Sequence, residues 1–115
     1  MSLLDPPTDS KDRKPSRQRL PDRRASERFD FEFSGTPFSA TISRFANGQL
    51  GEIFIDCHKV GSALGILAAD AAILASIALQ HGADLDTLRH ALSRDVRGNP
   101  TSPLGVALEH IGDMP

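Results

Sequence analysis

The chain has 115 residues, with 39% hydrophobic residues, 24% charged residues and a formal net charge of −2. This length suffices for one small domain and excludes a (β/α)₈ barrel, which needs roughly 250 residues, as well as a complete dinucleotide-binding oxidoreductase. Charge is spread unevenly, because residues 1–28 carry eight basic and five acidic side chains whereas residues 29–115 carry five and ten. The sequence therefore predicts a basic tail joined to an acidic body.

The cysteine count and the apolar runs indicate the cellular location. Cys57 is the single cysteine, so the chain cannot form the internal disulfides that staple small secreted domains. Residues 1–7 lack the apolar core of a signal peptide. The longest apolar run, residues 63–79, is largely alanine and contains Asp70 and Ser76, so we expect it to fall short of a transmembrane helix. The sequence predicts a cytoplasmic protein without a membrane partner.

The tail and the body are expected to differ in order. Residues 1–20 contain three of the eight prolines and no apolar periodicity. Such a segment cannot bury enough apolar surface to offset the entropy of ordering it. We therefore expect residues 1–20 to be disordered and residues 21–115 to form the folded domain.

Apolar and polar residues alternate in three segments after the tail, residues 29–33, 38–42 and 50–57. A period of two is typical of half-buried β-strands. Turn residues at positions 34–37 separate the first two segments, and Asn47-Gly48, a strong hairpin signal, separates the last two. The three segments therefore predict an antiparallel meander.

Three helices are predicted after the strands, and each has a capping signal. They cover residues 63–81 between Ser62 and Gly82, a segment from Asp84 or Asp86 to about residue 93, and residues 104–111 after Ser102-Pro103. The predicted order is βββααα. This order indicates the α+β class, with the helices packed on one face of the three-stranded sheet.

The long helix carries apolar residues on more than one side. One stripe consists of Leu64, Leu67, Ala71, Leu74 and Ala78, and another of Ile66, Ile73 and Ile77 with Asp70 beside it. A helix of this kind is covered on two sides. The sheet can cover one side, and the later helices or a second subunit must cover the other, so we expect a homo-oligomer with Ile66, Asp70, Ile73 and Ile77 at its interface. Asp70 either pairs with a cation such as Lys59 or lies at the exposed margin of the stripe.

Several short segments together carry a family resemblance. These are Gly51-Glu52-Ile53-Phe54-Ile55, Lys59-x-Gly61-Ser62 before the alanine-rich helix, and Arg19-Leu20-Pro21-x-x-Arg24 upstream. Over residues 19–112 the sequence resembles the TSCPD domain family. Near the last helix the chain reads Thr101-Ser102-Pro103-Leu104, without the cysteine and aspartate of the family's string, so no thiol or carboxylate role is carried over to it.

The resemblance implies a function. TSCPD domains occur as the C-terminal accessory region of adenosylcobalamin-dependent (class II) ribonucleotide reductases and as short stand-alone proteins. The reductase reaction needs a radical cysteine, a reducing cysteine pair and a cobalamin site. A chain of this length with a single cysteine cannot supply this set. The resemblance thus implies a stand-alone accessory domain linked to DNA synthesis, without catalytic residues or a cofactor, whose partner is a ribonucleotide reductase or another protein. The alternative within this class is an accessory subunit of a ribonucleoside-diphosphate reductase.

A candidate anion or nucleotide site precedes the long helix. It consists of His58, Lys59, Gly61 and Ser62. The N-terminus of a helix presents free N–H groups and partial positive charge, which suit a phosphate. In the alternative interpretation, Ser62 only caps the helix and Gly61 only makes the turn.

Other chemistry-bearing residues give little indication of a site. Cys57 and His58 are adjacent, and strand alternation directs them to opposite faces. The histidines at positions 58, 81, 90 and 110 lack metal-ligand spacing, so we expect no metal site. No Ser-His-Asp arrangement can be argued from the sequence.

The basic arm offers a second class of function. Its basic residues are Lys11, Arg13, Lys14, Arg17, Arg19, Arg23 and Arg24. Such an arm can bind nucleic acid electrostatically, which would make the chain a small nucleic-acid-associated protein. The alternative is an arm that only improves solubility.

Overall fold

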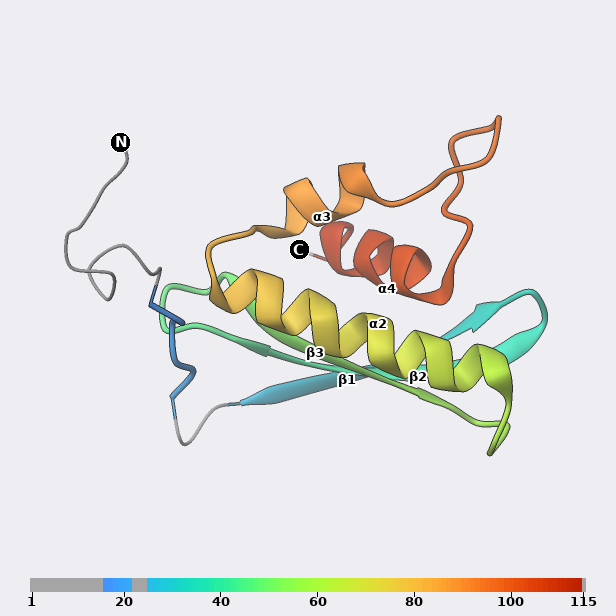
Figure 1. The fold of residues 1–115 in the computed structure, drawn as a ribbon, viewed down its shortest axis with the longest axis horizontal. Helices are drawn as coiled ribbons and strands as arrows, with labels where there is room; N and C mark the ends of the chain where they lie inside the picture. Colours follow the sequence, from blue (N-terminus) through green and yellow to red (C-terminus); the bar gives the residue numbers. More distant parts are fainter. Residues whose placement is uncertain (1–15, 22–24, 115) are drawn as a thin grey trace, which may run out of the picture.

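The computed structural model describes residues 16–21 and 25–114, and within them it confirms the predicted α+β fold with the order βββααα (Figure 1). The sheet is antiparallel with the strand order β1-β2-β3. The elements are β1 (Ser26–Phe33), β2 (Thr36–Arg44), β3 (Leu50–Cys57), α2 (Ala63–Gln80), α3 (Leu85–Ala91) and α4 (Pro103–Gly112). The helices lie on one side of the sheet (Figure 1).

The alternation of the strands determines which side chains enter the core. Phe29 lies opposite Ala40 across β1 and β2, and Ile42 lies opposite Ile53 across β2 and β3. Phe38, Ala40, Ile42, Ile53 and Ile55 are at most 2% exposed. The strands therefore supply most of the largest buried side chains of the core, and α2 and α4 add Leu79 and Leu108.

Both hairpin turns use left-handed backbone. Ser34 and Gly35 have φ values of 53° and 79°, and Gly48 has a φ of 88°. The first turn is shorter than predicted, because β2 already begins at Thr36. Pro37 fits into this strand because its nitrogen carries no proton and so leaves no donor without a partner. Its carbonyl oxygen accepts a hydrogen bond from the N–H of His58 at 3.1 Å.

The side of α2 that faces the sheet differs from the expectation. Neither the leucine nor the isoleucine stripe faces the sheet. The buried residues of α2 are Gly65, Ala68, Ala72, Ala75, Ser76, Leu79 and Gln80, whereas Ile66, Leu67, Ile73 and Leu74 are exposed. The physical reason is volume: the strands fill the core with phenylalanine and isoleucine, so a helix must present small side chains to lie close to them.

Polar side chains of α2 cap the outer edge of β3. The hydroxyl of Ser76 lies 2.9 Å from both the backbone nitrogen and the carbonyl oxygen of Ile53, and Nε2 of Gln80 donates to the carbonyl of Gly51 at 3.0 Å. Both side chains are 5% exposed. They satisfy backbone groups that a strand edge otherwise leaves unpaired, and they thereby protect this edge.

Part of the predicted tail contacts the body. The N–H of Gln18 donates to the carbonyl of Gln80 at 2.6 Å, and Nε of Arg17 donates to the Gln80 side chain at 2.5 Å. Leu20 lies so close to Gly51 that a Cβ there would be 2.7 Å from it. Residues 17, 18 and 20 therefore contact the folded body, the boundary between tail and domain stays a prediction, and residues 1–15 lie outside the described residues.

The last two helices begin at the predicted caps. Asp84 caps α3 by accepting a hydrogen bond from the N–H of Thr87 at 2.8 Å, and hydrogen bonds from the side chain and backbone of Thr87 lower the pKa of Asp84. Ser102 caps α4 by accepting from the N–H of Gly105 at 3.1 Å. Between them, residues 94–100 form a projecting loop, closed by a bridge between Arg94 and Pro100 (Figure 1).

By length and composition alone, α2 can also cross a membrane, since its mean hydropathy is 1.8 over 18 residues. This result differs from the expectation that residues 63–79 fall short of a transmembrane helix. However, the buried side of α2 packs on β3, and its Ser76 and Gln80 bond to the backbone of that strand. This is the arrangement of a core helix in a compact domain, and cytoplasmic location stays a prediction.

Candidate docking surface

The main candidate site is an apolar surface on the outer side of α2. Its members are Ile66, Leu67, Ile73, Leu74 and Ile77, which are between 39% and 67% exposed, and we call it the α2 outer face. Single exposed aliphatic residues are ordinary, but a contiguous set on one helix marks an interaction site in many soluble proteins. The α2 outer face can therefore bind another apolar surface.

An apolar groove adjoins this face. Its volume is about 310 Å³, and its walls are Ala71, Leu74, Ala75 and Ala78 of α2 together with Leu88, Leu92 and Leu104. Leu88 belongs to α3 and Leu104 to α4. The groove thus continues the α2 outer face toward the two later helices, which cover the half-buried Ala71 and Ala78 of the predicted leucine stripe.

The predicted interface residues lie together on this part of the helix. Ile66, Ile73 and Ile77 belong to the α2 outer face, and Asp70 is exposed beside them. Among the described residues, Asp70 makes no ion pair with Lys59 or with an arginine. Coverage of this surface by a second subunit stays a prediction.

The four residues of the predicted anion site have separate roles in the structure. Ser62 uses its hydroxyl to cap α2, accepting from the N–H of Gly65 at 3.0 Å, and Gly61 makes the turn with a φ of 77°. Lys59 is exposed, whereas His58 bonds to Ser39 on β2. The capping role of Ser62 is thus present, and anion binding stays a prediction.

Sequence reasoning missed a polar cluster around Ser39, on the sheet face opposite the helices. The hydroxyl of Ser39 lies 2.7 Å from Oδ1 of Asp30, 2.6 Å from Nε2 of His58 and 2.9 Å from Nη2 of Arg28. A carboxylate only accepts, so Ser39 donates its proton to Asp30 and accepts from Nη2 of Arg28. In a nucleophilic triad the histidine lies between the serine and the carboxylate, whereas here Ser39 lies between Asp30 and His58.

The neighbouring thiol lies on the other side of the strand. Sγ of Cys57 is 3.6 Å from the hydroxyl of Ser62 and 3.4 Å from the backbone nitrogen of Lys59, while His58 contacts Ser39. Alternation had predicted this opposite placement of Cys57 and His58. Within residues 16–21 and 25–114, no group of three potential ligands is placed to hold a metal ion.

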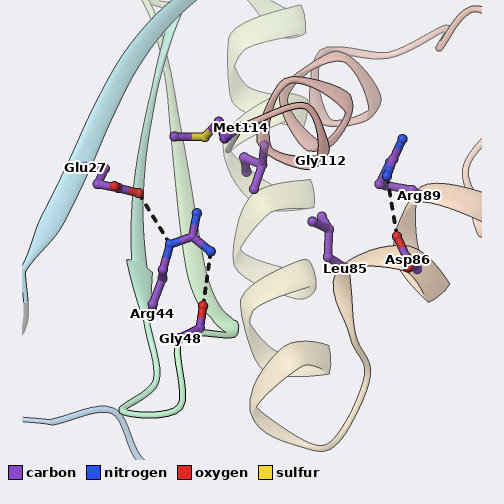
Figure 2. A pocket seen from close by; sticks show the side chains of 9 residues that line it. Glu27, Arg44, Gly48, Leu85, Asp86, Arg89, Gly112 and Met114 are labelled. Atoms are coloured by element: carbon purple, nitrogen blue, oxygen red, sulfur yellow. Dashed lines mark hydrogen bonds and ion pairs between the residues drawn. The ribbon is translucent and has the colours of Figure 1, made fainter.

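A cavity of about 550 Å³ lies between the sheet and the C-terminal helices (Figure 2). Arg44 lines one wall and is paired with Glu27 at 3.5 Å, and Arg89 lines the other and is paired with Asp86 at 3.4 Å. Each cation of the cavity already has a carboxylate partner, so the lining favours no charged ligand class.

The basic arm is only partly described. Arg17 and Arg19 are exposed, and Arg17 is bonded to Gln80. The other predicted members, Lys11, Arg13, Lys14, Arg23 and Arg24, lie outside the described residues. Nucleic-acid binding by this arm stays a prediction.

Comparison with known proteins connects the chain to one group of large enzymes. It is 35% identical over 88 residues to a vitamin B12-dependent ribonucleotide reductase of Bradyrhizobium diazoefficiens, an alignment that covers 76% of this chain and 7% of the reductase. The chain is similar to a small part of this reductase. Proteins of the same name from Rhodopirellula baltica and Agrobacterium fabrum are 34% and 36% identical, over 70% and 61% of this chain and 8% and 6% of their own length.

These similarities confirm the predicted resemblance to part of a class II ribonucleotide reductase. The chain spans 6–8% of the length of the curated relatives that it matches. No family model matches the chain, and no solved structure matches it. The ribonucleotide reductase-like character of the domain therefore rests on the sequence similarity to the three reductases.

Proposed function

We propose that this chain is a non-catalytic binding domain that docks through the α2 outer face onto a vitamin B12-dependent ribonucleotide reductase. The observation that carries the proposal is the exposure of five large aliphatic side chains on α2, the helix whose small side chains pack on the sheet. In the similar reductases, the matching segment is part of a chain more than ten times its length. An apolar docking surface fits a domain whose relatives are joined to such a large body.

Binding without turnover fits the chemistry of the described residues. Cys57 is the one cysteine, and its sulfur is half-buried against Ser62 and Lys59. The hydroxyl of Ser39 is engaged in three hydrogen bonds within the domain. The proposal therefore assigns the work of this domain to contact with the reductase.

The test is a binding titration between the full chain and a purified vitamin B12-dependent ribonucleotide reductase from the same cell. Leu67→Glu places a charge on the α2 outer face without touching the core, because Leu67 is 67% exposed. We expect this substitution to weaken binding by at least about tenfold, since a buried unpaired charge is costly at an interface. The free energy of unfolding should stay within about 0.5 kcal/mol of the wild type.

The matched controls are Val60→Glu and Val96→Glu, which introduce the same charge at side chains that are 96% and 105% exposed but lie outside α2. Both should bind like the wild type. Binding that is absent in the wild type, or that Val96→Glu weakens as much as Leu67→Glu does, would contradict the proposal. If nucleic acid binds instead and deletion of residues 1–20 abolishes that binding, the basic arm carries the function.

A further inference from the structure

The two edges of the sheet are treated differently by the fold. The edge of β3 is covered by α2, with Ser76 and Gln80 bonded to its backbone. Along the outer edge of β1, no backbone hydrogen bond reaches any other segment within the described parts of the chain. An open edge of eight residues is a template for pairing with another strand.

The hydrogen-bond pattern shows which residues of β1 present free backbone groups. Because the backbone of Ile53 bonds outward to Ser76, the pair Ile42–Ile53 is not hydrogen-bonded, and Ile42 must bond toward Glu27 on β1. Odd-numbered residues of β1 therefore bond to β2. Even-numbered residues, including Arg28, Asp30 and Glu32, direct their N–H and C=O groups away from the sheet.

We propose that β1 pairs antiparallel with β1 of a second copy of this chain, with Arg28 of each copy opposite Asp30 of the other. In an antiparallel pair related by a two-fold axis, the residue numbers of any two opposed positions add up to the same sum. Because the free backbone groups belong to even-numbered residues, an even-numbered residue must face another even-numbered residue, and the sum is even. A sum of 58 places Arg28 opposite Asp30 twice and Ser26 opposite Glu32 twice. A sum of 56 opposes two Arg28 residues, and a sum of 60 opposes two Asp30 residues.

Charge complementarity thus favours one register, in which no like charges lie opposite each other on this face. On the helix side of the sheet, the same register places the two Phe29 side chains opposite each other at the two-fold axis. Phe29 is half-buried and stacks on His110 with 4.1 Å between ring centroids, so its exposed margin is an aromatic surface at the open edge. The pair would form one continuous six-stranded sheet with all helices on one side.

The first experiment measures the mass of the full chain in solution across a concentration series, by analytical ultracentrifugation. We expect a dimer of twice the 12.4 kDa monomer mass. Arg28→Asp and Asp30→Arg each place like charges opposite each other, and each should raise the dimer dissociation constant by about tenfold or more. The double exchange restores complementarity and should return the constant to within about threefold of the wild type.

A cross-link tests the register independently of these charges, which also contact Ser39 within one copy. In a Cys57→Ser background, Phe29→Cys should form an intermolecular disulfide on mild oxidation, because position 29 faces itself across the axis. The matched control Phe31→Cys faces position 27 and should not. A monomer at all concentrations, a dimer that only Leu74→Glu dissociates, or a cross-link at position 31 in place of position 29 would each overturn the proposal. The first and third outcomes leave reductase binding untouched, whereas a dimer that only Leu74→Glu dissociates would occupy the α2 outer face that we propose for the reductase.

Discussion

Replacement of Ser76 by alanine tests how the fold protects the edge of β3. The hydroxyl of Ser76 is 2.9 Å from the backbone nitrogen and carbonyl oxygen of Ile53, a residue with 0% exposure. Without it, the buried N–H of Ile53 loses its acceptor, and an unsatisfied buried group costs about 1–3 kcal/mol. The carbonyl of Ile53 loses less, because the one hydroxyl proton of Ser76 is shared with the carbonyl of Ala72, which lies 3.0 Å from the hydroxyl oxygen. Alanine recovers about 0.5 kcal/mol through its higher helix propensity. We therefore expect a net loss of about 2 kcal/mol in the free energy of unfolding.

Urea unfolding followed by circular dichroism measures this loss. A slope of about 2 kcal/mol/M for a domain of this size converts the loss into a midpoint lower by about 1 M. Ser62→Ala is the comparator in the same helix, because it removes a solvent-accessible cap and should cost only about 1 kcal/mol. A Ser76→Ala variant within 0.5 kcal/mol of the wild type would refute the reasoning, since it would mean that water or a shift of α2 satisfies Ile53 equally well.

Two further predictions concern a glycine and a carboxylate. Gly65→Ala should destabilise the domain by about 1–3 kcal/mol although alanine favours helices, because the new Cβ would lie 2.6 Å from Cβ of Cys57. Gly112→Ala is its control and should cost less, since the new Cβ meets only the flexible end of Arg89; equal losses in thermal unfolding would argue against packing as the cause. Hydrogen bonding from Arg94, with a smaller contribution from Arg89, lowers the pKa of Glu109, so its stabilisation is present above the ordinary pKa of a glutamate and is lost as pH falls through the lowered pKa. Glu109→Gln should therefore show a weaker dependence of the urea midpoint on pH between pH 5 and 3, and an unchanged dependence would exclude this contribution.

Local signals were sufficient to predict the elements and their order. The period of two and the Asn47-Gly48 turn identified the strands, and Ser62 and Ser102 identified the starts of α2 and α4. Each of these signals depends on only a few neighbouring residues, so it can be recognised without knowledge of the tertiary structure. The contact of Leu20 with Gly51 has no local signal, because it depends on how a distant strand lies, so the sequence did not predict it.

The Ser39 cluster and the α2 outer face were harder to predict. The cluster depends on the register of the strands, and the exposed side of α2 depends on the size of the strand side chains that the helix packs against. Arg28, Asp30 and Ser39 meet only when β1 and β2 pair in the observed register, and His58 joins them from the end of β3. The helix presented apolar residues on every side, so periodicity alone could not select the buried one. The buried side of α2 is the one with small side chains, because the strand side chains are large. This result could be predicted only once the side chains that the sheet directs toward the helix were known.

In α2, the residues that pack on the sheet differ from the residues that we propose for docking. Its small residues and its two capping side chains hold the helix on β3, so the large aliphatic residues of the α2 outer face are not needed to form the core. A contiguous exposed apolar surface marks an interaction site in many proteins. The β1 edge lies across the sheet from the strand that α2 covers. A pair joined through β1 would therefore keep both α2 outer faces free on the same side of its sheet, and a reductase with two equivalent sites would bind such a pair more tightly than it binds one copy.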